Sequence, residues 1–330
     1  MWPSEITENI FGCVKSQVFY VCHDLGVFQY LIEEAHGSAE ETSKALSCDE
    51  GNLARLMNAA CTLGLLVETQ GRYSVNPPLA EYLDKRSERY CGGFIGHMHG
   101  STYEQLRHLS AAVKSGQGLW NGEDSPFDKL YGEESLAREF ITAMWNIGFG
   151  AAMELVDRID LSSHEMLVDI GGASGSFSVA ALKRFPNLSA TIFDLAPVGK
   201  YVDETRRLYD LESRLCFKQG DFWRDDYPEG DVYVFGYILS DWMTEEGSKL
   251  LKKARGRMSG GKIIILEKLF DDIKSRGPQT TAMADITMMV ETRGMHRTAQ
   301  EYIQMLNDAA IGDVSVIRSS GDKHMIVGQV

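Results

Sequence analysis

The stretch Val168-Asp169-Ile170-Gly171-Gly172-Ala173-Ser174-Gly175 decides the fold that we expect for this chain. It places a glycine-rich turn between an apolar run, residues 166–170, and a helix-like segment, residues 176–185. An acidic residue, Asp194, follows Gly175 by 19 positions, at the end of a second apolar run. Glycines let the backbone approach a ligand closely, and a carboxylate at this spacing accepts hydrogen bonds from ribose hydroxyls. The stretch therefore predicts a nucleoside pocket at the carboxyl edge of a parallel sheet.

Strand-like and helix-like segments alternate from about residue 164 onward. Helical stretches near 176–185, 199–209 and 244–258 lie among the first five strand candidates, in three of the four intervals, which predicts a parallel, doubly wound sheet. Only residues 319–324 join the last two candidates, and so short a link fits an antiparallel hairpin. We therefore predict an α/β fold with a Rossmann-like, seven-stranded class I methyltransferase sheet that ends in an antiparallel hairpin. The strand candidates are residues 166–170, 191–195, 215–218, 231–239, 263–267, 314–318 and 325–330.

The N-terminal third has the pattern of helices followed by a hairpin. Apolar residues recur at helical spacing in residues 14–25, Ser38 begins a second helix with a capping-box pattern, and residues 52–64 give a third helix. Residues 65–75 form two short strand candidates, so the region predicts a winged helix. DNA binding is disfavoured because residues 1–100 hold 7 Lys and Arg against 13 Asp and Glu, and phosphate repels such a surface. A dimerisation role is the favoured interpretation.

The bulk composition narrows the class of protein further. The 330 residues carry a formal charge of -14, which disfavours nucleic acids and anionic membranes as partners. Six cysteines, at positions 13, 22, 48, 61, 91 and 216, form no CxxC pair and no disulfide framework, which indicates a reduced intracellular protein. No leader sequence and no apolar run of membrane-spanning length is recognisable, so we expect a cytoplasmic protein.

A second acid with aromatic neighbours follows the third strand candidate, in residues 220–223 (GDFW). The carboxyl ends of adjacent parallel strands line one crevice, so Asp169, Asp194 and Asp221 are expected to face the same ligand. A carboxylate beside aromatic rings suits adenine, whose exocyclic amine donates to the acid while a ring stacks on the base. In the alternative interpretation, Asp221 caps the following turn. The acid-aromatic pair and the terminal hairpin favour S-adenosylmethionine over NAD as the cofactor.

These stretches make the chain resemble the S-adenosylmethionine-dependent O-methyltransferases, a family that includes plant caffeic acid, animal hydroxyindole and bacterial antibiotic-tailoring enzymes. The matching stretches are LVDIGGASGSF, TIFDLAPV, GDFW, YILSDWMTEEG, KIIILEKL and RGMHRTAQEY. The resemblance implies a winged-helix dimerisation domain over residues 1–100, a helical connector lining the acceptor pocket over residues 101–160, and a cofactor-binding catalytic domain over residues 161–330. It also implies a homodimer that converts S-adenosylmethionine to S-adenosylhomocysteine.

The resemblance places the cofactor on the glycine-rich turn and the strand ends beside it. Its methionine end is expected at Asp169 and the glycines, its ribose at Asp194 and its adenine at Asp221 and Phe222. Ala173 replaces a glycine common in the family, which is tolerated if its φ stays negative. The cofactor-binding residues predicted in this way are Asp169, Gly171, Gly172, Gly175, Asp194, Leu195, Asp221, Phe222, Trp223 and Tyr237.

The catalytic positions depart from the family pattern. The family's general base is a histidine before Asp-Trp, but here Ser240 precedes Asp241, and a hydroxyl is too weak a base to replace it. Of the two glutamates that orient that histidine in the family, one matches Glu267 and the other is replaced by His296. We therefore predict Ser240, Asp241, Glu267 and His296 as the catalytic residues. In the favoured mechanism His296, positioned by Glu267 or Asp241, is the base for O-methylation.

Other interpretations stay open at this point. The acceptor could need little deprotonation, as in N-methylation or in C-methylation of an α-keto acid, the latter with a metal in one branch of the family. Ser240 leaves the metal-binding triad of that branch one ligand short, so we assign no metal ligands. A further alternative is bound cofactor that serves a non-methylating reaction. His296 could also be a structural residue beside Thr298, a candidate N-cap for a helix over residues 299–310.

The acceptor pocket is expected to be apolar. Residues 280–292 read as a methionine-rich helix, which in relatives helps to line this pocket, and methionine suits a flat apolar ring. A small aromatic or otherwise apolar metabolite is therefore the expected acceptor. The substrate-lining residues that the resemblance predicts are Phe140, Met144, Trp145, Trp242, Met288 and Met289.

Overall fold

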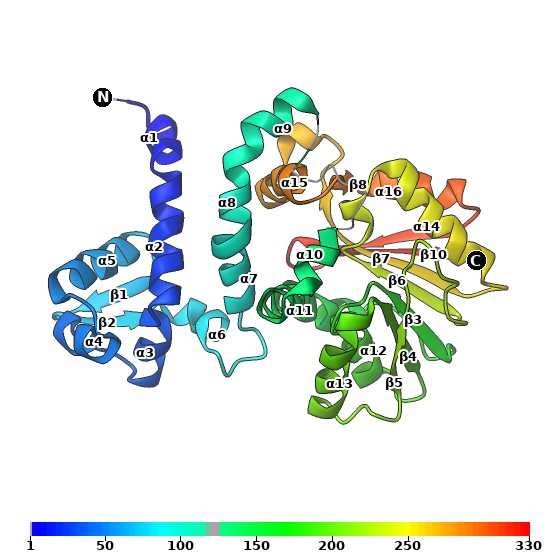
Figure 1. Cartoon of the computed structure of the whole chain (residues 1–330), viewed down its shortest axis with the longest axis horizontal. Coiled ribbons are helices and arrows are strands. Elements are labelled where there is room, and N and C mark those ends of the chain that lie inside the picture. Colours follow the sequence, from blue (N-terminus) through cyan, green and yellow to red (C-terminus); the bar gives the residue numbers. More distant parts are fainter. Residues whose placement is uncertain (1, 117, 119–125) are drawn as a thin grey trace. The chain divides into compact units, whose positions relative to one another are not determined.

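The computed structural model describes residues 2–116, 118 and 126–330. These residues divide into two compact units, Met1–Gly100 and Ser101–Val330. Figure 1 shows helices and a small hairpin in the first unit, and a large sheet flanked by helices in the second. In the described ranges, no helix is long and apolar enough to cross a membrane.

The first unit has the helices and hairpin of the predicted winged helix, around a core of its own. The capping box expected at Ser38 is present: Ser38 Oγ accepts from the N–H of Glu41, and the Glu41 carboxylate accepts from the N–H of Ser38. The hairpin strands pair antiparallel. The elements are α1 (Ser4–Ile10), α2 (Gly12–Asp24), α3 (Val27–Glu33), α4 (Ala39–Leu46), α5 (Glu50–Thr62), β1 (Leu66–Thr69), β2 (Arg72–Val75), η1 (Pro77–Leu79), α6 (Ala80–Leu83) and α7 (Gly92–His97).

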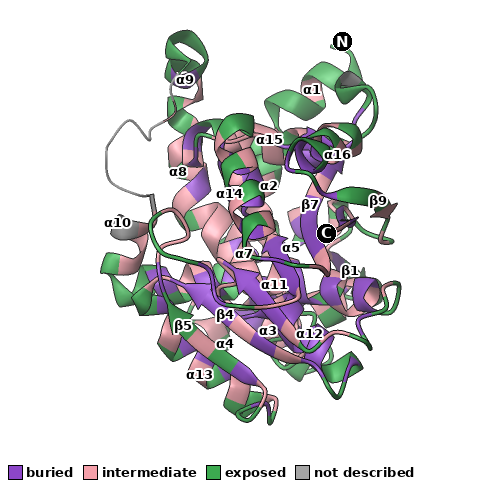
Figure 2. Ribbon diagram, turned by 90° about the vertical axis from the view of Figure 1, so that its right-hand side faces the viewer, coloured by how far each residue is buried: buried purple, intermediate pink, exposed green. Residues whose placement is uncertain are grey.

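An exposed apolar stripe runs along α1 and the start of α2. Four of its members are spaced four residues apart, the fifth is next to one of these, and each is more than half exposed. Figure 2 shows α1 as a largely exposed helix. Large apolar side chains gathered in this way mark an interaction surface, whereas scattered single ones do not. The members of this N-terminal stripe are Trp2, Ile6, Ile10, Phe11 and Val14.

The sheet of the second unit has the strand order β5-β4-β3-β6-β7-β10-β9. The first five strands in this order are parallel, and β10 is antiparallel to both β7 and β9, which confirms the predicted sheet and its terminal hairpin. Because β3 lies between β4 and β6, its carboxyl end is the topological switch point. The strands are β3 (Met166–Ile170), β4 (Ser189–Asp194), β5 (Leu215–Gln219), β6 (Val232–Gly236), β7 (Lys262–Phe270), β9 (Gly312–Ile317) and β10 (Lys323–Gln329).

One short strand was not predicted. β8 (Arg297–Thr298) pairs in parallel with the end of β7, at Leu269 and Phe270. Two residues are too few to show the alternation of a strand, so the sequence carries no signal for it. Thr298, the last residue of β8, also caps α16 (Ala299–Asp308) as considered above: its hydroxyl accepts from the N–H of Glu301 at 3.2 Å.

Helices cover both faces of the sheet (Figure 1). One core joins α11, α12 and α13 to one face, and a second core joins α14 and α16 to the other. Adjacent residues of a strand point to opposite faces, so Leu167 belongs to the first core and Val168 to the second. The helical elements are a π-helical turn (Met98–Thr102), α8 (Tyr103–Gln105), η3 (Leu106–His108), α9 (Leu109–Ser115), α10 (Pro126–Gly132), α11 (Glu134–Val156), α12 (Ser176–Arg184), η4 (Ala196–Val198), α13 (Gly199–Leu208), η5 (Leu239–Asp241), α14 (Thr244–Gly256), η6 (Lys274–Arg276), α15 (Gln279–Glu291) and α16 (Ala299–Asp308).

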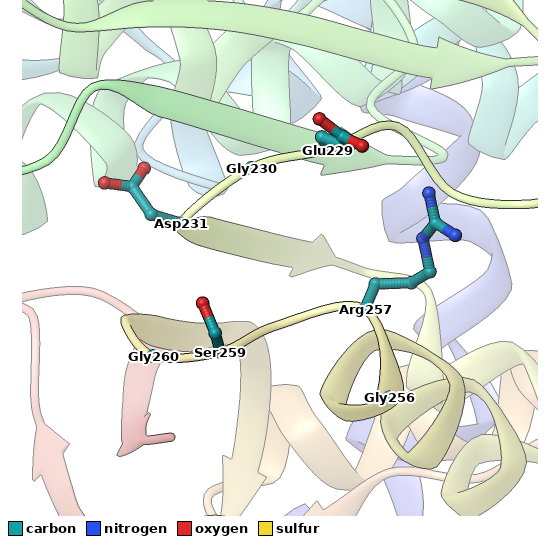
Figure 3. Close-up of a pocket in the computed structure, with 7 residues that line it drawn as sticks. All are labelled: Glu229, Gly230, Asp231, Gly256, Arg257, Ser259 and Gly260. Carbon is teal, nitrogen blue, oxygen red and sulfur yellow. The ribbon is translucent and has the colours of Figure 1, made fainter.

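A polar hollow of about 400 Å³ lies at the amino edge of the sheet, where β6 and β7 begin (Figure 3). Glu229, Asp231 and Arg257 are among its lining residues. The Asp231 carboxylate accepts from the backbone N–H groups of Glu165 and Met166, so it fastens the start of β3. Predicted site residues lie instead at the carboxyl ends of the strands, and this hollow is therefore not assigned a role in catalysis.

Candidate active site

The glycine-rich turn leaves β3 at the switch point with a backbone that favours glycine. Gly171 and Gly175 have φ values of 64° and 83°, in the left-handed region. A Cβ at Gly171 would lie 2.5 Å from Cδ1 of Ile238, and one at Gly175 would lie 2.4 Å from Cδ1 of Ile192. The turn is therefore packed against β4 and the segment after β6. These glycines are needed for the backbone path as well as for the approach of a ligand.

Gly175→Ala is expected to lower the free energy of unfolding by about 2–4 kcal/mol, from left-handed strain and overpacking together. Urea unfolding followed by circular dichroism measures the change. Gly150→Ala is the matched control, since a Cβ at this position of α11 meets no atom within 4 Å. Because alanine favours a helix, the control should gain about 0.5–1 kcal/mol. Equal stability of the two variants would show that the turn relaxes at no cost.

Asp194, at the end of β4, is tied to this turn. Its Oδ2 accepts from the N–H of Ala173 at 2.9 Å, and its Oδ1 accepts from the N–H of Leu195 at 2.7 Å. Ala173 directs its N–H to this carboxylate with a φ of 51°, so the negative φ that was the condition for tolerating alanine is not met. The hydrogen bond to a carboxylate offsets the left-handed strain of about 1–2 kcal/mol. Burial raises the pKa of Asp194 to about 6, against the opposing effect of these two hydrogen bonds.

Asp169, on β3, is buried beside the same turn. Its Oδ2 accepts from the hydroxyl of Ser178 at 2.7 Å, and a Cβ at Gly172 would lie 2.6 Å from its Cγ. Burial raises the pKa of Asp169 to about 6, while the hydrogen bond from Ser178 and the positive charge of Lys323 act in the opposite direction. The site predicted to bind the methionine end of the cofactor therefore contains a buried carboxylate, that of Asp169.

Lys323, on β10, is a residue of this site that the sequence did not indicate. Its Nζ lies 4.0 Å from the centre of the Tyr237 ring, and only 4% of the residue is exposed. Burial lowers the pKa of Lys323 to about 8, and the negative charges of Glu267 and Asp169 oppose that shift. The structure thus places a buried amino group against Tyr237, a predicted cofactor residue, and within electrostatic reach of Asp169 and the predicted catalytic residue Glu267.

Asp221 has the turn-capping geometry of the alternative interpretation. Its Oδ1 accepts from the N–H of Trp223 at 2.8 Å, in the turn after β5. The rings of Phe222 and Trp223 lie edge-on to Trp242, with centroid distances of 6.2 and 4.8 Å. Trp242, predicted to contact the acceptor, therefore packs with the rings predicted to contact adenine. Recognition of adenine by this aromatic group stays a prediction.

Ser240 and Glu267 form the centre of the predicted catalytic group. Ser240 lies in η5 and is 2% exposed, and Glu267 lies on β7 and is fully buried. Glu267 Oε1 accepts from the N–H of Ser240 at 3.0 Å, whereas Oε2 has no hydrogen-bond partner among the described residues. Burial raises the pKa of Glu267 to about 7, with hydrogen bonds from Ser240 acting against the shift. A carboxyl group with this pKa is suited to accept a proton at neutral pH.

His296 makes no hydrogen bond with Glu267 or Asp241 in the part of the chain that the structure describes. Its backbone N–H donates to Asp285 at 2.6 Å, and its Nδ1 is buried with no hydrogen-bond partner among the residues that the structure describes. Burial, followed by the positive charge of Lys268, lowers the pKa of His296 to about 4. The imidazole is therefore neutral at pH 7 and a weak base. Positioning by Glu267 or Asp241, which the sequence suggested, has no counterpart in these contacts.

Arg297 stabilises the backbone on both sides of Ser240 through hydrogen bonds. The guanidinium is fully buried and donates to the carbonyl oxygens of Leu239 at 2.8 Å and Trp242 at 2.7 Å. The same two segments also meet at Gly294, where a Cβ would lie 1.8 Å from the carbonyl oxygen of Ser240. The sequence did not single out Arg297, but its contacts make it a positioning residue for Ser240.

The aromatic residues predicted on α11 fall into two groups. Phe140 packs with Phe127 and Tyr131 of α10, at centroid distances of 6.1 and 6.3 Å. Trp145 instead stacks on Phe149 at 4.5 Å and packs on the core between α11 and the sheet. The structure therefore does not bring Trp145 together with Phe140, because five residues along a helix turn the side chain to another side.

Tyr131 connects this aromatic group with the acids of the site. Burial raises the pKa of its phenol well above the usual value, and the negative charges of Asp194 and Asp241 add to the effect. The pKa of Asp241 is itself raised by burial and then by the charges of Glu267 and Glu291. Tyr131 therefore lies within electrostatic reach of both the predicted ribose site and the catalytic group.

The predicted methionines are less enclosed. Met144 on α11 and Met288 on α15 are half-buried, and Met289 is 39% exposed. Next to them on α15, the Glu291 carboxylate accepts from the hydroxyl of the buried Thr102. Contact of the methionines with an acceptor stays a prediction. Within the described ranges, no group of three or more His, Cys, Asp and Glu side chains could hold a metal ion.

Comparison with known proteins assigns both parts of the chain to one family. An O-methyltransferase domain model matches residues 106–311, and an O-methyltransferase dimerisation domain model matches residues 7–85. Acetylserotonin O-methyltransferase of Bos taurus is 30% identical and covers 96% of this chain and 95% of its own. The 3-hydroxy-5-methyl-1-naphthoate 3-O-methyltransferase of Streptomyces sahachiroi is 28% identical and covers 99% and 95%. These relatives give no support to the C-methylating, N-methylating or non-methylating alternatives.

Solved structures agree in fold over the whole chain. The crystal structure of human N-acetylserotonin methyltransferase in complex with S-adenosylmethionine has a TM-score of 0.91 at 24% identity and covers 100% of this chain and 99% of its own. The mitomycin 7-O-methyltransferase MmcR has a TM-score of 0.84 at 22% identity, with 99% and 97% covered. The chain therefore belongs to the O-methyltransferase family and is an S-adenosylmethionine-dependent methyltransferase with an O-methyltransferase dimerisation domain.

Proposed function

We propose that this enzyme transfers a methyl group from S-adenosylmethionine to a hydroxyl oxygen of a small aromatic metabolite. The aromatic group of Phe127, Tyr131 and Phe140 carries the proposal, because Tyr131 is within electrostatic reach of Asp194 and Asp241. Aromatic side chains favour a planar, apolar acceptor. The names of the two relatives, which refer to acetylserotonin and to a hydroxynaphthoate, support an acceptor of this kind.

The chain's own residues fit the cofactor at the switch point. The glycine positions of the turn, Gly171, Gly172 and Gly175, have no room for side chains. Asp194 keeps carboxylate lone pairs for ribose hydroxyls beyond its two backbone hydrogen bonds. Lys323 and Asp169 offer opposite charges to the methionine carboxylate and ammonium groups. When bound, S-adenosylmethionine supplies an electrophilic methyl group, and these residues hold and orient it.

S-adenosylhomocysteine release over three acceptor panels tests the proposal: aromatic hydroxyls, aromatic amines and α-keto acids. We expect turnover of at least one phenol or naphthol, and the methyl group of the product on oxygen. Turnover confined to amines or keto acids would overturn it. Each panel is run with and without chelator, and only chelator-resistant phenol turnover agrees with the proposed site.

We further propose that the enzyme is a homodimer joined through the N-terminal stripe. Ile10→Asp is expected to shift the molecular mass in solution to that of a monomer, because an exposed apolar face is then interrupted by a charge. Light scattering after size-exclusion chromatography measures the mass. Leu208→Asp is the control, since Leu208 is 75% exposed on α13, outside the stripe. A wild-type protein that is itself monomeric, or an unchanged mass for Ile10→Asp, would refute this interface.

The proposed partners are therefore an acceptor molecule and a second copy of the chain. Acidic residues outnumber basic ones in residues 1–100, which supports the proposal that nucleic acid is not a partner. A gel-shift assay at low salt tests this and should show no binding. The formal charge of -14 likewise supports the absence of an anionic membrane surface as a partner. All six cysteines are unpaired, which supports a reducing, cytoplasmic location.

A further inference from the structure

Ser240 leaves the catalytic group without a base of its own. The residue is buried in η5, and its hydroxyl is far too weak a base to deprotonate a phenol. Phenols have pKa values of about 10, so a base that accepts the proton during methyl transfer is worth about 10²–10⁴-fold in rate. The proton acceptor must therefore come from the groups around Ser240.

Glu267 is the group that contacts Ser240 directly. One carboxylate oxygen is fixed, since Oε1 accepts from the Ser240 N–H at 3.0 Å. The other, Oε2, is buried and has no partner among the described residues. A buried carboxylate oxygen without a donor is unfavourable, so such an atom calls for a partner that arrives with a ligand. A hydroxyl group of the acceptor is a donor of this kind.

Burial raises the pKa of Glu267, and the hydrogen bonds from Ser240 and then the neighbouring positive charges act against that shift. Lys323 on β10 and Arg297 on β8 are the cations that face it, and Asp241 in η5 is the neighbouring acid. Two phenols, Tyr237 and Tyr302, complete the surroundings and have pKa values raised by burial and by the charge of Glu267. The resulting pKa of Glu267, about 7, suits a group that gains and loses a proton in each turnover.

His296 is the weaker candidate on the same grounds. Its backbone is held by Asp285, and Lys268 and Arg297 are the cations that act on its ring. A pKa of about 4 makes it about 10³-fold less basic than a group with a pKa of about 7. The groups that act on its ring are Lys268 on β7, Arg297 on β8 and Asp322 before β10, and among the described residues it makes no hydrogen bond with Ser240.

We propose that Glu267 is the catalytic general base of this enzyme, and that Ser240 is the residue that positions it. The proposal rests on the O-methylation proposed above. The acceptor O–H bond breaks and its proton moves to Oε2 of Glu267, while the oxygen forms a bond to the methyl carbon of the donor. The methyl–sulfur bond breaks with its electron pair left on sulfur, and Glu267 later releases the proton to water. Serine at position 240 is smaller than the family's histidine, which favours direct contact between the acceptor and the glutamate.

Glu267→Gln is the decisive variant, because the amide oxygen can still accept from the Ser240 N–H while the proton-accepting oxygen is lost. We expect kcat on the phenol acceptor to fall by about 10²–10⁴-fold, and S-adenosylhomocysteine affinity in calorimetry to stay within about threefold. His296→Gln is the matched comparison and should keep kcat within about tenfold. The reverse order of effects, with His296→Gln inactive and Glu267→Gln active, would overturn the proposal.

Ser240→Ala tests the positioning role through the pH profile. The variant keeps the backbone donor and loses the hydroxyl, whose hydrogen bond lowers the pKa of Glu267. The acidic limb of the kcat profile should therefore move to higher pH in Ser240→Ala, and it should disappear in Glu267→Gln. An acidic limb that stays unchanged in both variants would show that Glu267 is not the titrating base.

A measurement without acceptor separates this proposal from the proposed function. Since the pKa of Glu267 is raised by folding, its contribution to stability is lost as pH rises from about 4.5 toward about 7. The thermal midpoint of the wild type should therefore fall more steeply between about pH 4.5 and pH 7 than that of Glu267→Gln. Wild-type inactivity on all hydroxyl acceptors sinks the proposed function. An active wild type whose Glu267→Gln variant is equally active sinks only the assignment of the base.

Discussion

Arg297→Met is expected to lower the free energy of unfolding by about 3–5 kcal/mol, the range for breaking a buried charged network. The guanidinium is fully buried and donates to the carbonyl oxygens of Leu239, Trp242 and Met295. Methionine fills a similar volume but donates nothing, and each buried acceptor left unsatisfied costs about 1–3 kcal/mol. The change is measured by urea unfolding with circular dichroism as the probe.

Arg293→Met provides the control for this prediction. Arg293 lies four residues earlier in the same segment but is exposed, so its replacement should change stability by less than about 0.5 kcal/mol. Arg297→Lys should be intermediate, because one ammonium cannot reproduce the fork of a guanidinium. If Arg297→Met were as stable as Arg293→Met, the hydrogen bonds of Arg297 to the backbone around Ser240 would not contribute to the stability of the protein.

The parts of the fold that follow from local patterns could be predicted from the sequence. The apolar runs at 166–170 and 215–218 correspond to β3 and β5 within one residue, because the residues on either side of each run are typical of turns or helices. Ser38 and Thr298 cap their helices as expected, since a capping box needs only residues three positions apart. The terminal hairpin was predicted from the short connection, residues 319–324, between its two strands.

The parts of the site that depend on tertiary packing could not be predicted. Lys323 reaches Asp169 and Glu267 only because β10 pairs with β7, and nothing in its local sequence indicates a buried ammonium. The positive φ of Ala173 depends on a hydrogen bond to Asp194, 21 residues away. His296 was predicted to be the base from its position in a motif. Burial and then the charges of Lys268 and Arg297 lower its pKa, and none of these effects can be recognised in the motif. Motifs therefore indicated which residues to examine, and packing decides what they can do.

Asp194→Asn is expected to weaken S-adenosylhomocysteine binding by about 10–10²-fold, the effect of about 1.5–3 kcal/mol for hydrogen bonds to a charged acceptor. Both carboxylate oxygens accept backbone N–H groups, from Ala173 and Leu195. Asparagine can accept only one of these, and its NH₂ group then faces the other N–H. The turn and the ribose site should therefore both be disturbed. Titration calorimetry measures the affinity, and Asp226→Asn, an exposed acid, is the control.

The pH dependence distinguishes loss of binding from loss of folding. The pKa of Asp194 is raised by folding from 3.8 to about 6, so its contribution to stability is lost as pH rises through about 6. Ligand-free Asp194→Asn should therefore lose less stability than the wild type between about pH 4 and pH 6, although it binds more weakly. Wild-type affinity should fall below about pH 6, where protonation removes an acceptor for the ribose. Asp169 titrates in the same range, so the variant should retain part of this dependence. Affinity that is independent of pH in the wild type would remove Asp194 from the cofactor site.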